Sequence, residues 1–161
     1  MAIRNIRKYG DKVLTKVSKE IKEVDDKLLI LIEDMIDTMY DAGGVGLAAP
    51  QVGVLKRVIV IDVSEEGNEP IVLINPVILE TAGEQTGEEG CLSIPGKVGT
   101  VTRPNYVKVK AFNEKMEEII DEGTELKARA LCHEIDHLNG VLYPDKAIGG
   151  LRDVTDEEEA E

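Results

Sequence analysis

The sequence predicts an α+β fold in which mainly antiparallel strands pack around a C-terminal helix, with another helix placed before them. Two observations predict it: helical periodicity near both ends of the chain, and short runs rich in β-branched residues between them. The 161 residues, 42% of them hydrophobic, suffice for one domain with its own core. We expect a single domain over residues 1–150 and an acidic, mobile tail over residues 151–161.

The first helix is expected over residues 25–42. Its apolar residues recur every three or four positions and so share one face, while acidic residues fill much of the opposite face. Asp25 is suited to cap its start, and Gly43-Gly44 ends it. The apolar face consists of Leu28, Leu31, Ile32, Met35, Ile36 and Met39.

Four short segments that follow this helix are expected to be strands. Residues 57–63 and 71–74 are rich in β-branched residues, and Asn75-Pro76 breaks the second of these strands. Residues 107–112 alternate apolar and polar side chains and form a hairpin with residues 116–120 across a polar turn.

The last helix is expected to begin with Thr124 as its N-cap and to run to Leu138, where Asn139-Gly140 ends it. Within it, His133 and His137 lie four residues apart, so one helix face presents two imidazoles to the same ion. They are the only two histidines of the chain. The alternative is an unrelated pair of core or exposed histidines, but their spacing on a helix favours a metal site.

Glu134 lies between these histidines, where a carboxylate can handle the proton of a metal-bound water. Two histidines leave a catalytic site one ligand short, since three protein ligands and a water are usual. The glutamates at 157–159 are a poor source because they lie in the tail. Cys91, in a glycine-flanked turn that enters an apolar strand, is the better candidate, although a small buried packing residue is the alternative.

Composition excludes several classes of partner. The net charge of -13 argues against general binding to nucleic acid or anionic membranes. No apolar run approaches the ~18 residues of a membrane span, and no signal-peptide block follows the basic N-terminus. Two cysteines are too few for a disulfide framework. We therefore expect a cytoplasmic protein that binds neither nucleic acid nor membranes directly.

Three segments taken together are more specific than any one of them. Residues 44–51 read Gly-Val-Gly-Leu-Ala-Ala-Pro-Gln, which alone is a glycine-rich connection without the ending of a phosphate-binding loop. With Glu-Gly-Cys-Leu-Ser at 89–93 and His-Glu-Ile-Asp-His at 133–137, the chain resembles the peptide deformylases in motif order and spacing, from about Asp11 to about Ile148. The resemblance implies a metal-dependent hydrolase that removes the formyl group from formyl-methionyl nascent polypeptides and releases formate.

The resemblance also implies roles for the site residues. Cys91, His133 and His137 would bind one divalent ion, Fe(II) in vivo, with zinc or nickel replacing it on purification. Hydroxide on that ion would attack the formyl carbon, with Glu134 as general base and then acid. The developing charge on the formyl oxygen would be stabilised by the Gln51 side chain and the Leu92 backbone N–H. Substrate would be bound by Val45, Gly46, Gly90, Leu126 and Ala130, for which core packing is the alternative.

Some positions depart from the commonest family pattern. Cys132 replaces a glutamine and is expected to pack in the core, not to bind metal. Arg103 is expected to pair with Glu89 or Asp136 and so to support the ligands. The long basic C-terminal helix of some members is not found, so we expect ribosome association to be transient at most.

Two other functions are compatible with part of this pattern. A general zinc endoprotease would need a third ligand downstream and a long substrate cleft, and the sequence offers neither. A metal-binding domain without activity would need neither Glu134 nor Gln51. The family resemblance favours the deformylase.

Overall fold

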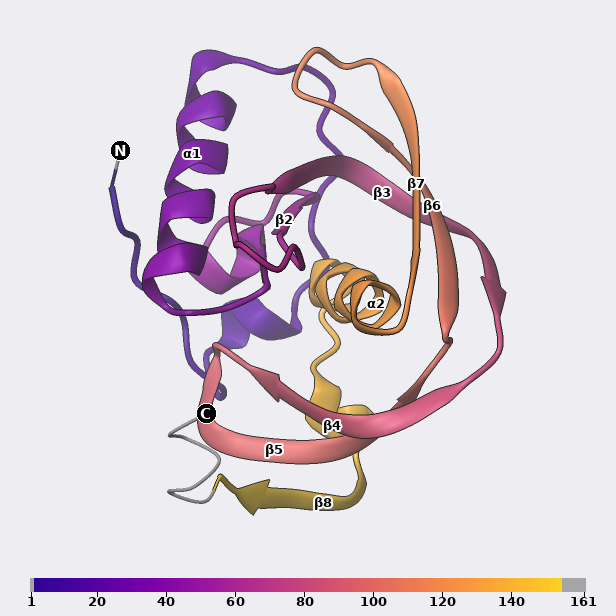
Figure 1. The fold of residues 1–161 in the computed structure, drawn as a ribbon. Helices are drawn as coiled ribbons and strands as arrows, with labels where there is room; N and C mark the ends of the chain where they lie inside the picture. The colour runs from indigo at the N-terminus through magenta and orange to yellow at the C-terminus, as the bar shows by residue number, and fades with distance from the viewer. Residues whose placement is uncertain (1, 155–161) are drawn as a thin grey trace.

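Two antiparallel sheets and two helices form the fold (Figure 1), which a computed structural model describes for residues 2–154. The larger sheet has strand order β1-β2-β3-β6-β7 and the smaller has order β4-β5-β8. The predicted α+β class with mainly antiparallel strands is confirmed. The helices are α1 (Asp26–Asp41) and α2 (Leu126–Leu138). The strands are β1 (Gly46–Ala48), β2 (Val58–Ile61), β3 (Ile71–Ala82), β4 (Gln85–Cys91), β5 (Ile94–Arg103), β6 (Tyr106–Phe112), β7 (Glu118–Thr124) and β8 (Ile148–Asp153).

The first helix forms with its predicted cap. The Asp25 side chain accepts a hydrogen bond from the backbone N–H of Leu28 at 2.9 Å. This bond satisfies one of the N–H groups that a helix start leaves without a partner. The apolar face of α1 is buried against β1 and β2, as its periodicity predicts.

Strand β2 lies between the two helices and is buried on both faces. Val58 and Val60 pack on the α1 side, whereas Ile59 and Ile61 pack on the α2 side. This double burial explains why the segment is apolar at every position instead of alternating. In Figure 1, α2 is viewed along its axis at the centre, with α1 to its left and the strands of both sheets around it. The core therefore surrounds α2 and fixes its position.

The predicted end of strand β3 at Asn75-Pro76 is wrong. Strand β3 continues to Ala82, and a register shift between Ile74 and Val77 accommodates the proline, which has no N–H to donate. Asn75 adopts a φ of 51°, and its side chain accepts from the N–H of Ile21 and donates to its carbonyl. The Asn75 side chain thus makes with the Ile21 backbone the two hydrogen bonds that a paired strand would otherwise make.

The predicted hairpin of β6 and β7 forms, and it changes the start of α2. Thr124 pairs with Tyr106 as the last residue of β7, so its predicted role as N-cap is wrong. Glu125, with a φ of 54°, holds the cap position without a side-chain cap bond. The predicted helix end is confirmed: Gly140 has a φ of 76°, and a Cβ there would lie 2.5 Å from the Thr15 carbonyl oxygen.

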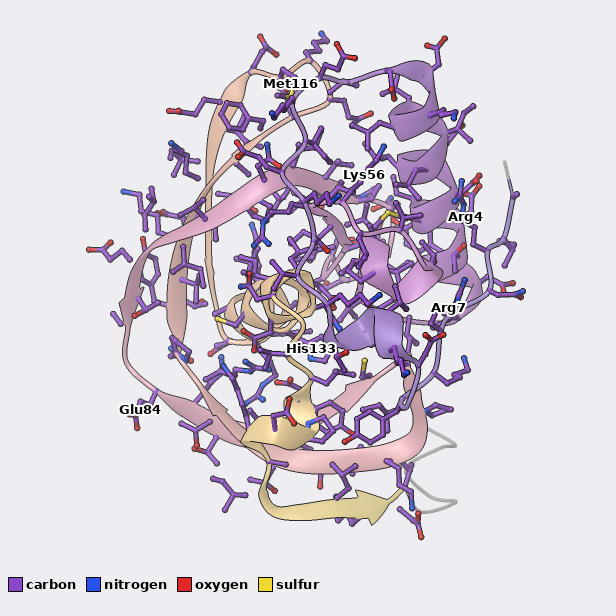
Figure 2. The ribbon with its side chains drawn as sticks, turned by 180° about the vertical axis from the view of Figure 1, so that it is seen from behind. Arg4, Arg7, Lys56, Glu84, Met116 and His133 are labelled. Atoms are coloured by element: carbon purple, nitrogen blue, oxygen red, sulfur yellow. The ribbon has the colours of Figure 1, made fainter. Side chains whose placement is uncertain are left out.

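The end of the described chain is more ordered than the sequence predicted. Strand β8 pairs with β5 and includes residues 151–153 of the segment that the sequence predicts as a tail. Residues 155–161 lie outside the described part of the chain. At the other end, Arg4 and Arg7 lie on the segment that runs beside α1 (Figure 2), where Arg4 donates to buried Asp34 at 2.9 Å. No helix within residues 2–154 has the length and apolar character to cross a membrane.

The bonds of Asn75 to Ile21 lead to a stability prediction. Asn75→Ala leaves the buried N–H and carbonyl of Ile21 without partners and places alanine at a positive φ, so we expect the free energy of unfolding to fall by about 3 kcal/mol. Urea denaturation followed by circular dichroism measures this. Asn68→Ala, in an exposed loop, is the control and should change stability by less than about 0.5 kcal/mol. Equal effects of the two substitutions would contradict a stabilising role for the hydrogen bonds between Asn75 and Ile21.

Candidate metal centre

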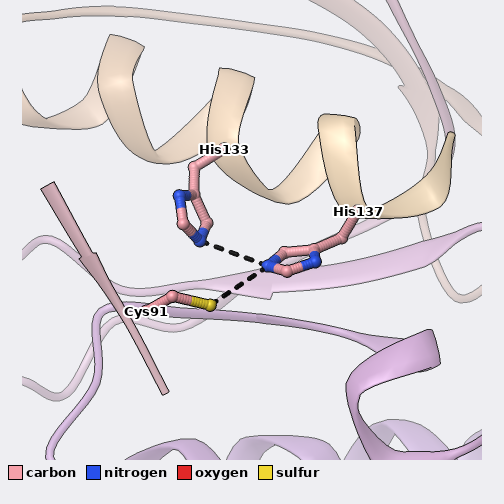
Figure 3. Close-up of side chains that lie close together, drawn as sticks. All are labelled: Cys91, His133 and His137. Carbon is pink, nitrogen blue, oxygen red and sulfur yellow. Dashed lines mark hydrogen bonds between the residues drawn. The ribbon is translucent and has the colours of Figure 1, made fainter. Parts of the chain in front are cut away.

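Two elements bring the three predicted ligands together (Figure 3). His133 and His137 project from one face of α2, and Cys91 is the last residue of β4. The His137 Nε2 lies 3.2 Å from the His133 Nε2 and 3.4 Å from the Cys91 Sγ. Within residues 2–154 this is the only group of three such side chains whose ligand atoms all lie within 4.8 Å of one another. Cys132 is not part of it and packs in the core beside Leu131, as predicted.

Two of the three separations between these donor atoms match those around a divalent ion, and all three atoms lie within 4.8 Å of one another. A tetrahedral ion with bonds of about 2.0–2.1 Å to nitrogen and 2.3 Å to sulfur separates two ligand nitrogens by roughly 3.3 Å. The same geometry separates nitrogen from sulfur by roughly 3.6 Å. The observed separations of 3.2 Å and 3.4 Å are within 0.2 Å of these values. A thiolate and two imidazoles are also the donor types that zinc and divalent iron accept.

A buried carboxylate orients one of the imidazoles. The Glu89 Oε2 lies 2.6 Å from the His133 Nδ1. An ionised carboxylate only accepts, so Nδ1 donates this hydrogen bond and Nε2 keeps its lone pair for an ion. Burial by itself would raise the pKa of Glu89, but hydrogen bonds from His133 and Arg103 outweigh it and hold that pKa well below its usual range.

Arg103 pairs with both carboxylates that the sequence offered as alternatives. It donates to Glu89 from Nε at 3.1 Å and from Nη2 at 2.6 Å. Its Nη1 donates to Asp136 at 2.6 Å. The Arg103 side chain is 3% exposed and the Glu89 side chain 4%, so these two charges are held together away from water. Arg103 thus connects strands β4 and β5 to α2 immediately behind the donor group.

The second imidazole is kept neutral. Burial, with a smaller contribution from the neighbouring His133, lowers the pKa of His137 to about 3. His137 is 1% exposed. An imidazole must be neutral to bind a metal, so this environment favours the ligand form throughout the physiological pH range.

Glu134 lies beside the donors in a position that strand β1 makes possible. Its Oε2 is 4.0 Å from the His133 Nε2, and its Oε1 has no hydrogen-bond partner among the described residues. A Cβ at Gly46 would lie 2.6 Å from the Glu134 Oε2, so only glycine leaves room for the carboxyl group. Burial raises the pKa of Glu134 to about 7, the range in which a group can both accept and return a proton.

The Gln51 amide is locked in one orientation. Its Oε1 accepts from the N–H of Ala48 at 3.0 Å, so the two N–H bonds of Nε2 point the other way. They lead to the Ser93 Oγ at 3.1 Å and the Cys91 Sγ at 3.5 Å. Leu92 lies in the turn between β4 and β5, next to Cys91. The amide and this turn therefore both adjoin Cys91, one of the three donor residues.

A pocket of about 490 Å³ opens beside these groups. Leu126 is 51% exposed at its wall, which argues against a core-packing role for this residue. His137 lies behind the pocket and does not line it. The pocket wall includes all five residues expected to bind substrate, namely Val45, Gly46, Gly90, Leu126 and Ala130, together with Gln51, Cys91, Leu92, His133 and Glu134.

The sequence interpretation missed Arg129. Its Nη1 donates to Glu89 at 2.8 Å and its Nη2 donates to the carbonyl of Val101 at 3.1 Å. A signal was present, because residue 129 precedes His133 by four positions and so lies on the same helix face. The sequence does not show which carboxylate pairs with Arg129, because Glu89 on β4 reaches α2 only in the folded chain.

Comparison with known proteins agrees with this geometry. The family model for polypeptide deformylase matches residues 3–152. The chain belongs to the polypeptide deformylase family. A peptide deformylase from Lachnoclostridium phytofermentans is 67% identical over 163 residues, which cover 100% of each chain. Peptide deformylase 1 from Clostridium acetobutylicum is 63% identical over 146 residues, which cover 91% of this chain and 95% of that relative.

Solved structures support the same conclusion for the fold. A peptide deformylase from Legionella pneumophila superposes with a TM-score of 0.88 at 47% identity, covering 91% of this chain and 87% of the other. One from Thermotoga maritima superposes with a TM-score of 0.86 at 45% identity, covering 91% and 98%. The resemblance seen in the sequence is confirmed, and with it the enzyme class: family members are metal-dependent hydrolases that remove the N-terminal formyl group of nascent peptides.

The two cysteines allow a matched test of the ligand set. We expect Cys91→Ala to weaken Zn²⁺ binding by more than the about 10- to 100-fold that follows loss of an outer hydrogen-bond partner. Cys132→Ala, in the core one residue before His133, should leave binding within about 3-fold of the parent chain. Competition against a chromogenic chelator measures both affinities. Full metal retention by the Cys91 variant would favour a ligand from residues 157–159.

Proposed function

We propose that the chain removes the formyl group from the N-terminus of formyl-methionyl polypeptides, with one divalent ion held by Cys91, His133 and His137. The observation that carries the proposal is the convergence of three donor atoms, of which the His137 Nε2 lies 3.2 Å from the His133 Nε2 and 3.4 Å from the Cys91 Sγ. Cys91 and His133 lie at the wall of a pocket that Glu134 also lines. A general zinc endoprotease is not favoured, because Cys91 supplies the third donor that it would need from downstream.

The proposed ion is Fe(II), with Zn²⁺ or Ni²⁺ as replacements on purification. Such an ion would polarise a carbonyl oxygen and make a water molecule nucleophilic near neutral pH. One thiolate and two imidazoles leave a tetrahedral site with one open position. A thiolate beside ferrous iron is exposed to oxidation, so we expect the iron form to lose activity in air.

Glu134 is proposed to carry the proton of the reaction. It is buried beside the donors, its Oε1 has no hydrogen-bond partner among residues 2–154, and its pKa of about 7 suits both directions of transfer. It would take a proton from the attacking water and then deliver it to the amine that leaves. The fixed position of the carboxyl group against Gly46 would keep one oxygen directed at the pocket.

Gln51 and Leu92 are proposed to stabilise the charge that develops on the formyl oxygen. The Gln51 amide is 1% exposed and held by Ala48 and Ser93, so Nε2 would redirect only the N–H that lies toward the Cys91 Sγ at 3.5 Å. The backbone N–H of Leu92 would be the second donor. Removing one such donor typically costs about 10²- to 10³-fold in kcat.

The substrate backbone is proposed to add to the free edge of β1. Among the described strands, β1 is at the edge of its sheet and pairs only with β2, so its other edge is where an extended chain would add. Val45, Gly46 and Gly90 would supply the backbone groups, and the methionine side chain would lie against Leu126 and Ala130. The mostly apolar wall there suits a thioether side chain.

The substrate also suggests where the enzyme acts. An N-terminal formyl group is carried by a nascent chain, so we propose transient association with ribosomes in the cytoplasm. Co-sedimentation of the chain with ribosomes that bear formylated nascent chains tests it, and absence from that pellet at low ionic strength would contradict it.

The activity is tested with a formyl-methionyl tripeptide under anaerobic conditions and with metal analysis of the same sample. We expect formate and free amine in equal amounts, at a rate proportional to the bound metal. A sample with full metal occupancy that releases no formate would contradict the proposal and favour a metal-binding domain without activity.

Glu134→Gln isolates the proton transfer from metal binding. Because the amide keeps the shape but cannot accept the proton, we expect kcat to fall about 10²- to 10⁴-fold while the metal content stays unchanged. Glu114→Gln, in the exposed turn between β6 and β7, is the control and should be fully active. A Glu134 variant with parent activity would remove this residue from the mechanism.

Arg103→Ala tests whether the hydrogen bonds of Arg103 to Glu89 and Asp136 support metal binding. The substitution removes both bonds to Glu89 and the bond to Asp136, so we expect metal affinity to fall about 10- to 100-fold. Arg7→Ala, at an exposed pair with Asp11, should leave affinity unchanged. Chelator competition measures both variants, and an unchanged affinity of the Arg103 variant would contradict the role.

A further inference from the structure

Glu89 is the meeting point of four hydrogen bonds from three side chains. Its Oε2 accepts from the His133 Nδ1 and the Arg103 Nη2, both at 2.6 Å. Its Oε1 accepts from the Arg103 Nε at 3.1 Å and the Arg129 Nη1 at 2.8 Å. The two oxygens therefore have different tasks: Oε2 holds the imidazole, and Oε1 is held by two guanidinium groups.

The charge of Arg103 is shared between two carboxylates. Its Nη1 lies 2.6 Å from Asp136, whose other cationic partner, Lys146, is 3.2 Å away and 45% exposed. An exposed ammonium is well hydrated and contributes little to such a pair, and the Asp136 side chain is itself 18% exposed. Arg103 alone therefore does not balance both carboxylates. Arg129 has Glu89 as its one carboxylate partner among the described residues.

The position of the Arg129 guanidinium is fixed from two sides. Its Nη2 donates to the Val101 carbonyl on β5, and its Nη1 donates to Glu89 on β4. The side chain is 9% exposed and comes from the face of α2 that carries both histidines. A planar fork with two occupied donors leaves the guanidinium little freedom to rotate. It can thus fix the plane of the Glu89 carboxylate.

We propose that Arg129 is a positioning residue of the metal centre. By holding the Glu89 Oε1, it keeps Oε2 on the His133 Nδ1, and so keeps the Nε2 of that ring directed at the ion. Without Arg129, Oε1 retains only its longer bond from Arg103, and the carboxylate can turn away from the imidazole. The inference rests on the ligand set proposed above. It adds Arg129 as a residue that positions one of those ligands, His133.

The competing explanation is that Arg129 is a buried ion pair that only stabilises the fold. Buried pairs are weak evidence for stability, and loss of one partner destabilises a protein whatever its role. A structural role would lower the melting temperature of the metal-free chain and leave the properties of the bound ion unchanged. The test must therefore measure the affinity and the coordination geometry of the bound ion.

Co²⁺ serves as the probe, because its visible bands report ligand geometry and a thiolate ligand adds a charge-transfer band. The full chain is compared with Arg129→Met, which keeps length without charge, and with Arg129→Lys, which keeps charge without the planar fork. Lys127→Met, on the same helix but paired with Asp121 at 2.7 Å and outside the pocket wall, is the matched control. Co²⁺ affinity, the visible spectrum and the melting temperature without metal are measured for each.

We expect Arg129→Met to bind Co²⁺ about 10- to 100-fold more weakly, with shifted ligand-field bands and a retained thiolate band. Arg129→Lys should be intermediate, and the Lys127 variant should match the parent. Parent affinity and spectrum in Arg129→Met would overturn the proposal, even if its melting temperature fell. If Arg129→Met does not fold, Arg129→Lys decides: weaker binding with shifted bands supports the proposal, and parent behaviour overturns it.

Failure of the ligand set itself would look different. A parent chain that takes up Co²⁺ without a thiolate charge-transfer band, or does not take it up, would contradict the metal centre before any variant is compared. A normal parent spectrum with an unaffected Arg129 variant would contradict only the role of Arg129.

Discussion

The burial of the Glu89 carboxylate is the constraint on which the rest of the site depends. An ionised carboxylate that is 5% exposed is tolerated only if it is paired and hydrogen-bonded. Here the partners come from two other elements: Arg103 from β5, and Arg129 and His133 from α2. Satisfying this one charge therefore requires β4, β5 and α2 to meet at a single point. The small sheet is held against the helix by the same contacts that orient His133, a proposed ligand.

The opposite wall of the site depends on a close approach and not on charge. Strand β1 passes so near to α2 that Gly46 has no room for a side chain beside Glu134. The same strand leads into the turn of Gln51, whose amide is locked by Ala48 and Ser93. The Glu134 carboxyl group and the Gln51 amide are thus both held in fixed positions beside the donor atoms.

Two element boundaries predicted from the sequence are wrong, and in both cases tertiary contacts override a local signal. Proline after Asn75 is a strand breaker by itself, yet β3 continues because a bulge absorbs it and the Asn75 side chain bonds Ile21, 54 residues away. Thr124 is a residue type that caps helices well, but in the fold it pairs with Tyr106 as part of β7. Local propensity is a weak determinant when a longer-range hydrogen-bond pattern competes for the same residue.

The sequence by itself determined the helix that carries His133 and His137, the candidate ligand Cys91 and the family. These follow from spacing along one element or from ordered motifs, which need no knowledge of distant contacts. The tertiary structure alone decided that Arg103 pairs with two carboxylates at once and that Arg129 belongs to the same network. The physical reason is that a charge shows its role only through its partner, and partners from β4 and α2 meet only after folding.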